Sequence, residues 1–105
     1  MFSTVVEVAS PLATRVRVCG ELDATGAAEF LEAMQPLVSE TQFLELDLAE
    51  LTFLDSSGLG AFVSLWKGLA ATNGRFRLVN LTDGVRRVLA VTNLESLFLE
   101  DEPIA

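Results

Sequence analysis

Hydrophobic and polar residues alternate along the first twenty positions of the chain. Residues 3–9 and 13–20 are rich in β-branched side chains with a period of two, and the pair Ser10-Pro11 lies between them. Such alternation is typical of half-buried β-strands, and a Ser-Pro pair favours a turn. The pattern predicts a hairpin, or two adjacent strands, at the start of the fold.

The hydrophobic period then lengthens to that of a helix. The apolar stripe of this predicted helix comprises Ala27, Phe30, Leu31, Met34 and either Leu37 or Val38. Asp23 or Thr25 is expected to cap it, because a side-chain oxygen can accept a hydrogen bond from a free amide of the first turn. Pro36, or the polar residues 39–42, is expected to help end it.

Strands and helices alternate through the remaining sequence. Residues 43–48 form a short predicted strand in which the leucines point away from Glu45 and Asp47. Further elements are predicted in the order strand 75–81, helix 82–93 and strand 96–100. The order predicts an α/β sandwich with a mixed sheet of about four to five strands. Helices are expected mainly on one face, because several strands keep a polar side.

Another amphipathic helix is predicted from Leu59 to the turn-forming pair Asn73-Gly74. Its apolar side comprises Leu59, Phe62, Val63, Trp66, Leu69 and Ala70. The opposite side comprises Ala61, Ser64 and Gly68, flanked by Gly60 and Lys67. Because this outward face has few long side chains, it would permit close approach by another protein.

The segment DSSG at residues 55–58 separates an apolar run from this helix. One Asp or Ser would suffice as a helix cap, which is worth ~1 kcal/mol. Here three such residues precede a glycine, which is a poor helix former. A serine nucleophile and a phosphate acceptor are therefore alternatives to a plain cap. A helix amino terminus stabilises an added anion, and a phosphate of ~1.5–2 negative charges at its edge would exclude a docked partner.

The composition argues against catalysis. The chain has no histidine, so Ser-His-Asp and Cys-His machinery and the usual zinc sites are impossible. Lys67 lies two turns along the helix, too far for a Ser-Lys pair, and no phosphate-binding loop motif is present. Cys19 is the only cysteine and is expected to be a small core residue. We expect neither a cofactor nor a metal.

Fifteen acidic against seven basic residues give a net charge of −8. This charge argues against a nucleic-acid partner and favours a basic protein partner, although acidity also serves solubility. No stretch approaches the ~18 apolar residues of a membrane span, and the amino terminus has no signal-peptide pattern. We expect residues 1–105 to form a single cytoplasmic domain without direct membrane contact, with a preference for the monomer.

Three segments together resemble the STAS domains of anti-sigma factor antagonists. They are GELD at 20–23, LDLAELTFLDSSGLG at 46–60, and RFRLVN at 75–80 followed by VRRVLAVTNLESLF at 85–98. The resemblance covers residues 16–98 and implies a STAS-like sandwich. It implies that Ser56, directly after Asp55, is phosphorylated by a partner kinase that doubles as an anti-sigma factor. Asp55, Ser57 and Gly58 would shape the acceptor site.

In this family the unphosphorylated antagonist binds the kinase and frees a sigma factor. Phosphorylation breaks the complex, and a PP2C-type serine phosphatase restores it, so the resemblance implies a binding protein rather than an enzyme. It places Asp23 near the partner surface, although a helix cap explains Asp23 equally well. Gly60, Ala61 and Ser64 are expected partner contacts because they lie on the outward face of the helix. Asn93 replaces a glycine of many relatives, and asparagine can adopt the left-handed conformation of that turn.

An alternative keeps the fold and discards the switch. The chain would then be an accessory subunit of a membrane transport system, or a small-ligand sensor, in which Ser56 is only a cap. If the switch exists but Ser56 is not the acceptor, Ser57 is the next candidate.

Overall fold

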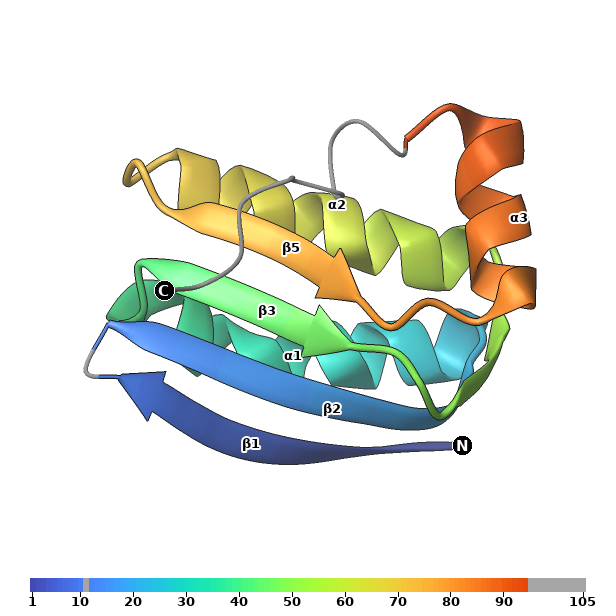
Figure 1. Ribbon diagram of the computed structural model, residues 1–105, viewed down its shortest axis with the longest axis horizontal. Helices are drawn as coiled ribbons and strands as arrows, with labels where there is room; N and C mark the ends of the chain where they lie inside the picture. Colours follow the sequence, from blue (N-terminus) through green and yellow to red (C-terminus); the bar gives the residue numbers. More distant parts are fainter. Residues whose placement is uncertain (11, 95–105) are drawn as a thin grey trace.

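Five strands and three helices make up the part of the chain that the structure, a computed structural model, describes, residues 1–10 and 12–94 (Figure 1). Along the chain they are β1 (Phe2–Ser10), β2 (Ala13–Leu22), α1 (Ala24–Glu40), β3 (Phe43–Asp47), β4 (Leu51–Leu54), α2 (Ser56–Ala70), β5 (Arg75–Val79) and α3 (Asp83–Thr92). The predicted α/β class is confirmed.

The sheet is mixed and is organised around β2. β1 pairs with β2 in antiparallel orientation, which confirms the predicted hairpin. β3 runs parallel to the first half of β2, from Ala13 to Arg17, and pairs on its other side with β5. β4 runs parallel to the last part of β2, from Gly20 to Leu22. The strand order is β1-β2-β3-β5, with β4 extending the sheet beside the end of β2.

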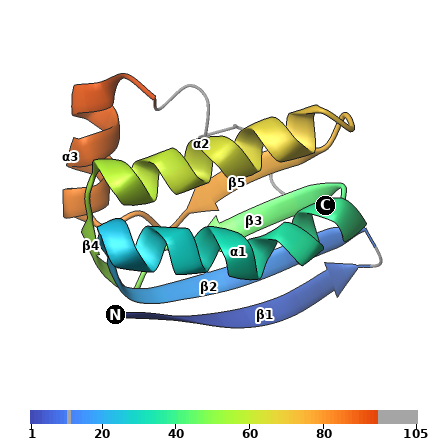
Figure 2. The same cartoon turned by 180° about the vertical axis from the view of Figure 1, so that it is seen from behind.

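Helices α1 and α2 lie side by side on one face of the sheet (Figure 2), as the sequence predicts. Helix α3 stands at one end of the sheet, close to β4 (Figure 2). Asp23 caps α1, Asp55 caps α2 and Thr82 caps α3. Two asparagines in the left-handed conformation follow α2 and α3, Asn73 and Asn93, each with φ of 60°. The expected turn chemistry is confirmed at both positions.

The core fills the space between the sheet and the two long helices. Phe30 of α1 lies at its centre, fully buried, with its ring centroid 5.9 Å from the rings of Phe2 and Phe62. Both pairs meet edge to face, the arrangement that aromatic quadrupoles favour. The surrounding buried side chains come from the sheet and from both long helices. They are Val16, Val18, Leu44, Leu46, Phe76, Leu78, Met34, Leu65 and Leu69.

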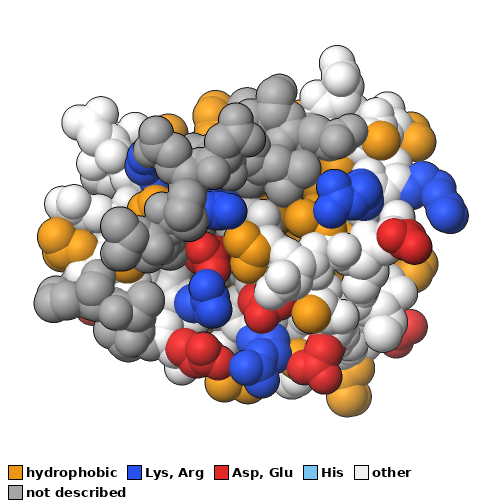
Figure 3. All heavy atoms as spheres, in the orientation of Figure 1, with side chains coloured by type: hydrophobic (Ala, Val, Ile, Leu, Met, Phe, Trp, Pro, Cys, Tyr) orange, Lys and Arg blue, Asp and Glu red, His pale blue; other side chains and the backbone are white. Residues whose placement is uncertain are grey.

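The helix-free face of the sheet is charged rather than apolar (Figure 3). One row across four strands contains Glu7, Arg15, Glu45 and Arg77 in register. Glu45 is only 3% exposed, and the Arg15 guanidinium donates to its carboxylate at 2.7 Å. Glu45 and Asp47 thus point away from the core leucines, as expected, and the burial of Glu45 is made tolerable by a paired charge.

Helix α1 continues through Pro36 and ends at Glu40, so of the two predicted ends the polar residues 39–42 are confirmed and Pro36 is not. The proline removes only one amide donor, and buried Val38 keeps the next turn on the core. One further element was missed, and one expectation was wrong. The sequence pattern did not predict β4 as a separate strand, because four residues within a longer apolar run are too few to show a two-residue period. Cys19 is half-buried on the helix-free side, 3.6 Å from a carboxylate oxygen of Glu50, rather than in the core. The predicted strand at 96–100 lies outside the described residues.

Within residues 1–10 and 12–94, no helix combines the length and apolar character that crossing a membrane requires.

Phe30 provides a test of this core. Phe30→Ala should lower the free energy of unfolding by about 3–5 kcal/mol, because it leaves a cavity between two other rings. Val91→Ala is the control, since Val91 is 82% exposed on α3, and it should change stability by no more than about 0.5 kcal/mol. Urea denaturation followed by circular dichroism measures both, and similar losses in the two variants would contradict this core assignment.

Candidate functional site

Two helix amino termini lie next to each other at one end of the sheet (Figure 2). Leu22 at the end of β2 pairs with Leu54 at the end of β4. The residue that follows each strand is an aspartate that caps a long helix: Asp23 caps α1 and Asp55 caps α2. Because the two strands are parallel and in register, both caps and both first turns are brought to the same end of the molecule.

Ser56 is the first residue of α2 and is exposed to solvent. The preceding residue, Asp55, uses one carboxylate oxygen to accept from the amides of Ser57 at 2.9 Å and Gly58 at 3.2 Å. Ser57 is half-buried and Gly58 is buried. The DSSG segment therefore contains one cap, one accessible hydroxyl, one partly covered hydroxyl and one packed glycine.

Gly58 allows the first turn of α2 to lie directly against the ends of β2 and β4. A β-carbon added at this position would lie 2.5 Å from Leu54 Cδ1 and 3.0 Å from both the Cβ and the carbonyl oxygen of Leu22. A side chain fits there only if the Leu54 side chain moves and Leu22 shifts by a few tenths of an ångström. The glycine thus has a packing role, which spacing alone had not shown.

The outward side of α2 is narrower than the sequence suggested. Gly60, Ser64 and Lys67 are exposed, as expected. Ala61 was expected on this face, and the expectation was wrong: Ala61 is only 4% exposed and belongs to the core. Leu65, absent from the predicted apolar side, is 1% exposed, whereas Ala70 is exposed.

The reason for the difference is that α2 packs against α1 as well as against the sheet. The Phe30 and Phe62 rings meet between the two helices, and a β-carbon on Gly68 would lie 3.1 Å from Val38 Cγ1. A helix with two packing neighbours buries a wider arc than a single stripe. Of the predicted partner-contact residues, Asp23, Gly60 and Ser64 are accessible at this end and on this helix, and Ala61 is not.

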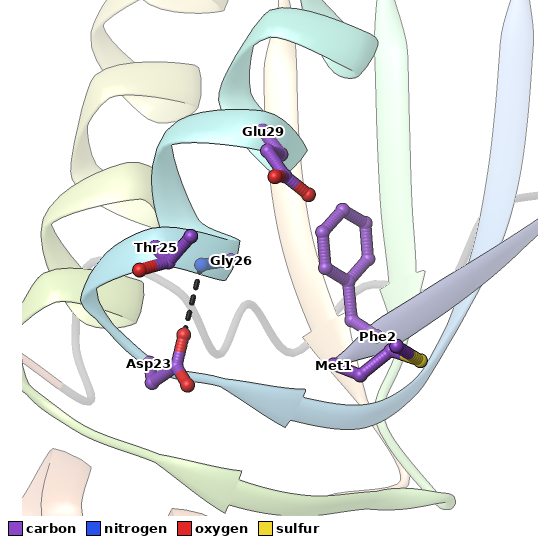
Figure 4. Close-up of a pocket in the computed structure, with 6 residues that line it drawn as sticks. All are labelled: Met1, Phe2, Asp23, Thr25, Gly26 and Glu29. Carbon is purple, nitrogen blue, oxygen red and sulfur yellow. Dashed lines mark hydrogen bonds between the residues drawn. The ribbon is translucent and has the colours of Figure 1, made fainter.

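A cleft of about 270 Å³ adjoins the start of α1 (Figure 4). Its lining residues are Met1, Phe2, Asp23, Thr25, Gly26 and Glu29. The Asp23 carboxylate accepts from the Gly26 amide at 2.8 Å, so its cap bond lies in the cleft wall. Of these residues, the sequence pointed to Asp23 as a partner contact and to Asp23 or Thr25 as a cap. The cleft itself could not be predicted, because the pairing of β1 with β2 is what brings Phe2 next to α1. Across the described ranges, no three His, Cys, Asp or Glu side chains are grouped as metal ligands.

Comparisons with known proteins agree with this architecture. The sequence model of the STAS domain matches residues 5–104. The chain is 36% identical over 81 residues to an anti-sigma-B factor antagonist of Listeria monocytogenes, covering 76% of this chain and 71% of the relative. It is 30% identical over 83 residues to the anti-sigma-B factor antagonist of Bacillus subtilis, covering 79% and 76%.

A solved structure shows the same fold. The crystal structure of an anti-sigma factor antagonist from Mycobacterium paratuberculosis superimposes with a TM-score of 0.84 at 28% identity. The similarity covers 97% of this chain and 87% of the other.

Gly58 and Gly60 form a matched pair for testing the packing at the start of α2. Both substitutions replace glycine by alanine in α2 and gain helix propensity, which should raise stability by about 0.5–1 kcal/mol in Gly60→Ala, since Gly60 has no atom within 4 Å of an added β-carbon. Gly58→Ala should be less stable than Gly60→Ala by about 1–3 kcal/mol, because its methyl group overlaps Leu22 and Leu54. Thermal and urea unfolding measure the difference, and equal stabilities of the two variants would refute the close approach.

Proposed function

The chain belongs to the STAS domain family, and we propose that it is an anti-sigma factor antagonist controlled by phosphorylation of Ser56. The unphosphorylated form binds an anti-sigma factor that is also a serine kinase, and this binding releases a sigma factor. Phosphorylation by that kinase ends the binding, and a PP2C-type serine phosphatase restores it. The relatives named as anti-sigma-B factor antagonists support the antagonist function.

The accessibility of Ser56 is the observation that carries the switch. Ser56 is exposed at the first position of a 15-residue helix, whereas the neighbouring Ser57 is half-buried. A kinase can reach the Ser56 hydroxyl without unfolding α2. The residues that hold this turn in place, Asp55 through its cap bonds and Gly58 through its packing, are separate from the acceptor itself.

The fold would tolerate a phosphate at this position while the complex would not. The dipole of α2 favours an anion at its amino terminus, and exposed Ser56 lets the phosphate extend into water away from Asp55, so the charge costs the domain little. On the partner side, ~1.5–2 negative charges would enter a surface that has to lose its water on docking. A thousandfold loss of affinity requires only ~4 kcal/mol, which one badly placed phosphate can supply.

In the proposed reaction this chain is the substrate and the kinase the catalyst. The Ser56 Oγ forms a bond to the γ-phosphorus of ATP, the bond to ADP breaks, and the hydroxyl proton leaves to the kinase. Asp55 is not needed as a base, because its carboxylate is already bound to two amides of α2. Positioning and charge stabilisation by the kinase account for most of such a transfer.

The domain, its location in the cell and the charge of its partner follow from the same function. Residues 1–105 act as a single STAS domain, a monomer in the cytoplasm, that works through protein partners. A net charge of −8 is unfavourable for binding nucleic acid and favourable for a partner with a basic docking surface. Asp23, Gly60 and Ser64 contribute to the surface that the partner covers.

Intact-mass spectrometry of the protein expressed in its own host tests the switch. The wild type should gain about 80 Da under the condition that inactivates it, the mass of one added phosphoryl group. Ser56→Ala should abolish this gain, and Ser57→Ala, the matched control, should retain it. Binding of the two phosphorylation states to the purified anti-sigma factor should differ by about a thousandfold.

Two other results would change or refute the proposed switch. A phosphate that persists in Ser56→Ala and disappears in Ser57→Ala would move the switch to Ser57. Absence of phosphate in every condition, with no binding to an anti-sigma factor, would refute the proposal and favour the transport-accessory or sensor alternative.

A further inference from the structure

Strand β4 contains a β-bulge directly before the Ser56 turn. On β2, Gly20, Glu21 and Leu22 are consecutive, but their partners on β4 are Leu51, Phe53 and Leu54. Thr52 is therefore an extra residue without a partner in the ladder. Its hydroxyl donates to the Gly20 carbonyl oxygen at 3.0 Å, which fixes the bulge against β2.

The bulge turns a phenylalanine toward solvent. Neighbouring strand residues point to opposite faces, so a regular strand with Leu51 in the core would also bury Phe53 and expose Leu54. With the extra residue, Leu51 and Leu54 are both buried, at 0% and 7% exposure, and Phe53 is 45% exposed. Bulges redirect side chains in this way and are frequent beside functional sites.

Phe53 lies three residues before the proposed phosphorylation site. Only Leu54 and Asp55 separate it from Ser56, so the two Cα atoms are at most about 11 Å apart. Its partner across the ladder is Glu21, which is exposed, and exposed Asp23 follows two residues later along the chain. Phe53 is therefore an exposed aromatic residue paired with an exposed acidic residue, three positions before the acceptor serine.

We propose that Phe53 is the apolar anchor with which this chain docks on its anti-sigma factor. The occupant of this surface is an apolar pocket of that partner, bordered by basic side chains that pair with Glu21 and Asp23. Aromatic residues in desolvated pockets provide much of the affinity at protein interfaces, and surrounding polar pairs exclude water. The inference rests on the proposed function and adds to it the contact surface and the chemistry of the partner's pocket.

In this arrangement one residue provides the affinity for the partner and another controls whether the partner binds. Phe53 supplies the apolar contact, and the Ser56 Cα is at most about 11 Å from the Phe53 Cα, which puts Ser56 at the border of the proposed pocket. A phosphate there would have to be desolvated together with the ring. The effect of phosphorylation on binding then depends on the anchor being in place.

The experiment measures binding of full-length variants to the host's purified homologue of anti-sigma-B factor by isothermal titration calorimetry. Phe53→Ala and Phe53→Thr should each weaken binding at least about tenfold, the range of an interface hot spot. Val5→Ala is the matched control, since Val5 is 46% exposed in the middle of β1, and its affinity should equal that of the wild type. Thermal unfolding verifies that each variant is folded, and the threonine variant preserves strand propensity.

The outcomes separate this inference from the function on which it rests. If the wild type binds, phosphorylated protein does not, and both Phe53 variants bind like the wild type, the anchor is refuted and the switch remains. If Val5→Ala weakens binding as much as the Phe53 variants, the contact is not localised and the inference is also overturned. If the wild type fails to bind, both the proposed function and the anchor are rejected.

Discussion

The parallel pairing of β2 with β4 is the constraint on which the functional end of the molecule depends. It places Leu22 opposite Leu54 at the same end of the sheet. Asp23 and Asp55 are the next residues in the chain, and each caps the helix that follows. A shift of the register by one residue would turn a leucine out of the core and separate the two helix starts. The location of Ser56 thus follows from a backbone register and two caps, not from contacts of its own side chain.

The helix packing and the helix-free face of the sheet stabilise that end of the molecule. Edge-to-face packing of Phe30 with Phe62 joins α1 to α2, and the missing side chain of Gly58 lets α2 approach the sheet. On the helix-free face, Arg15 pairs with Glu45 and Arg17 with Glu7. Charges that are already paired within the sheet give a partner little to gain there. We therefore expect recognition at the end where the helices begin.

Features determined by neighbours in sequence could be predicted, and features determined by distant neighbours could not. The Asp23 cap and the left-handed Asn93 follow from side-chain chemistry acting over three or four residues. The burial of Ala61 could not be predicted, because it depends on α1 packing along one flank of α2. The exposure of Phe53 depends on a bulge that only the pairing with β2 defines. Nor does the sequence separate Ser56 from Ser57 by local chemistry, since both are serines after an aspartate.

Exposure and the Asp55 cap together distinguish these serines. The Asp55 carboxylate already occupies the amides of Ser57 and Gly58, the groups that would otherwise bind an anion at this helix start. A phosphate on Ser56 would compete with a carboxylate for these amides and would be repelled by it. It would therefore extend toward solvent, where it meets the partner, while the dipole of α2 still lowers its cost. A phosphate on half-buried Ser57 would instead press on the packed first turn. In this geometry the cap both fixes the turn and directs the added charge outward, so the switch can act on binding without unfolding the domain.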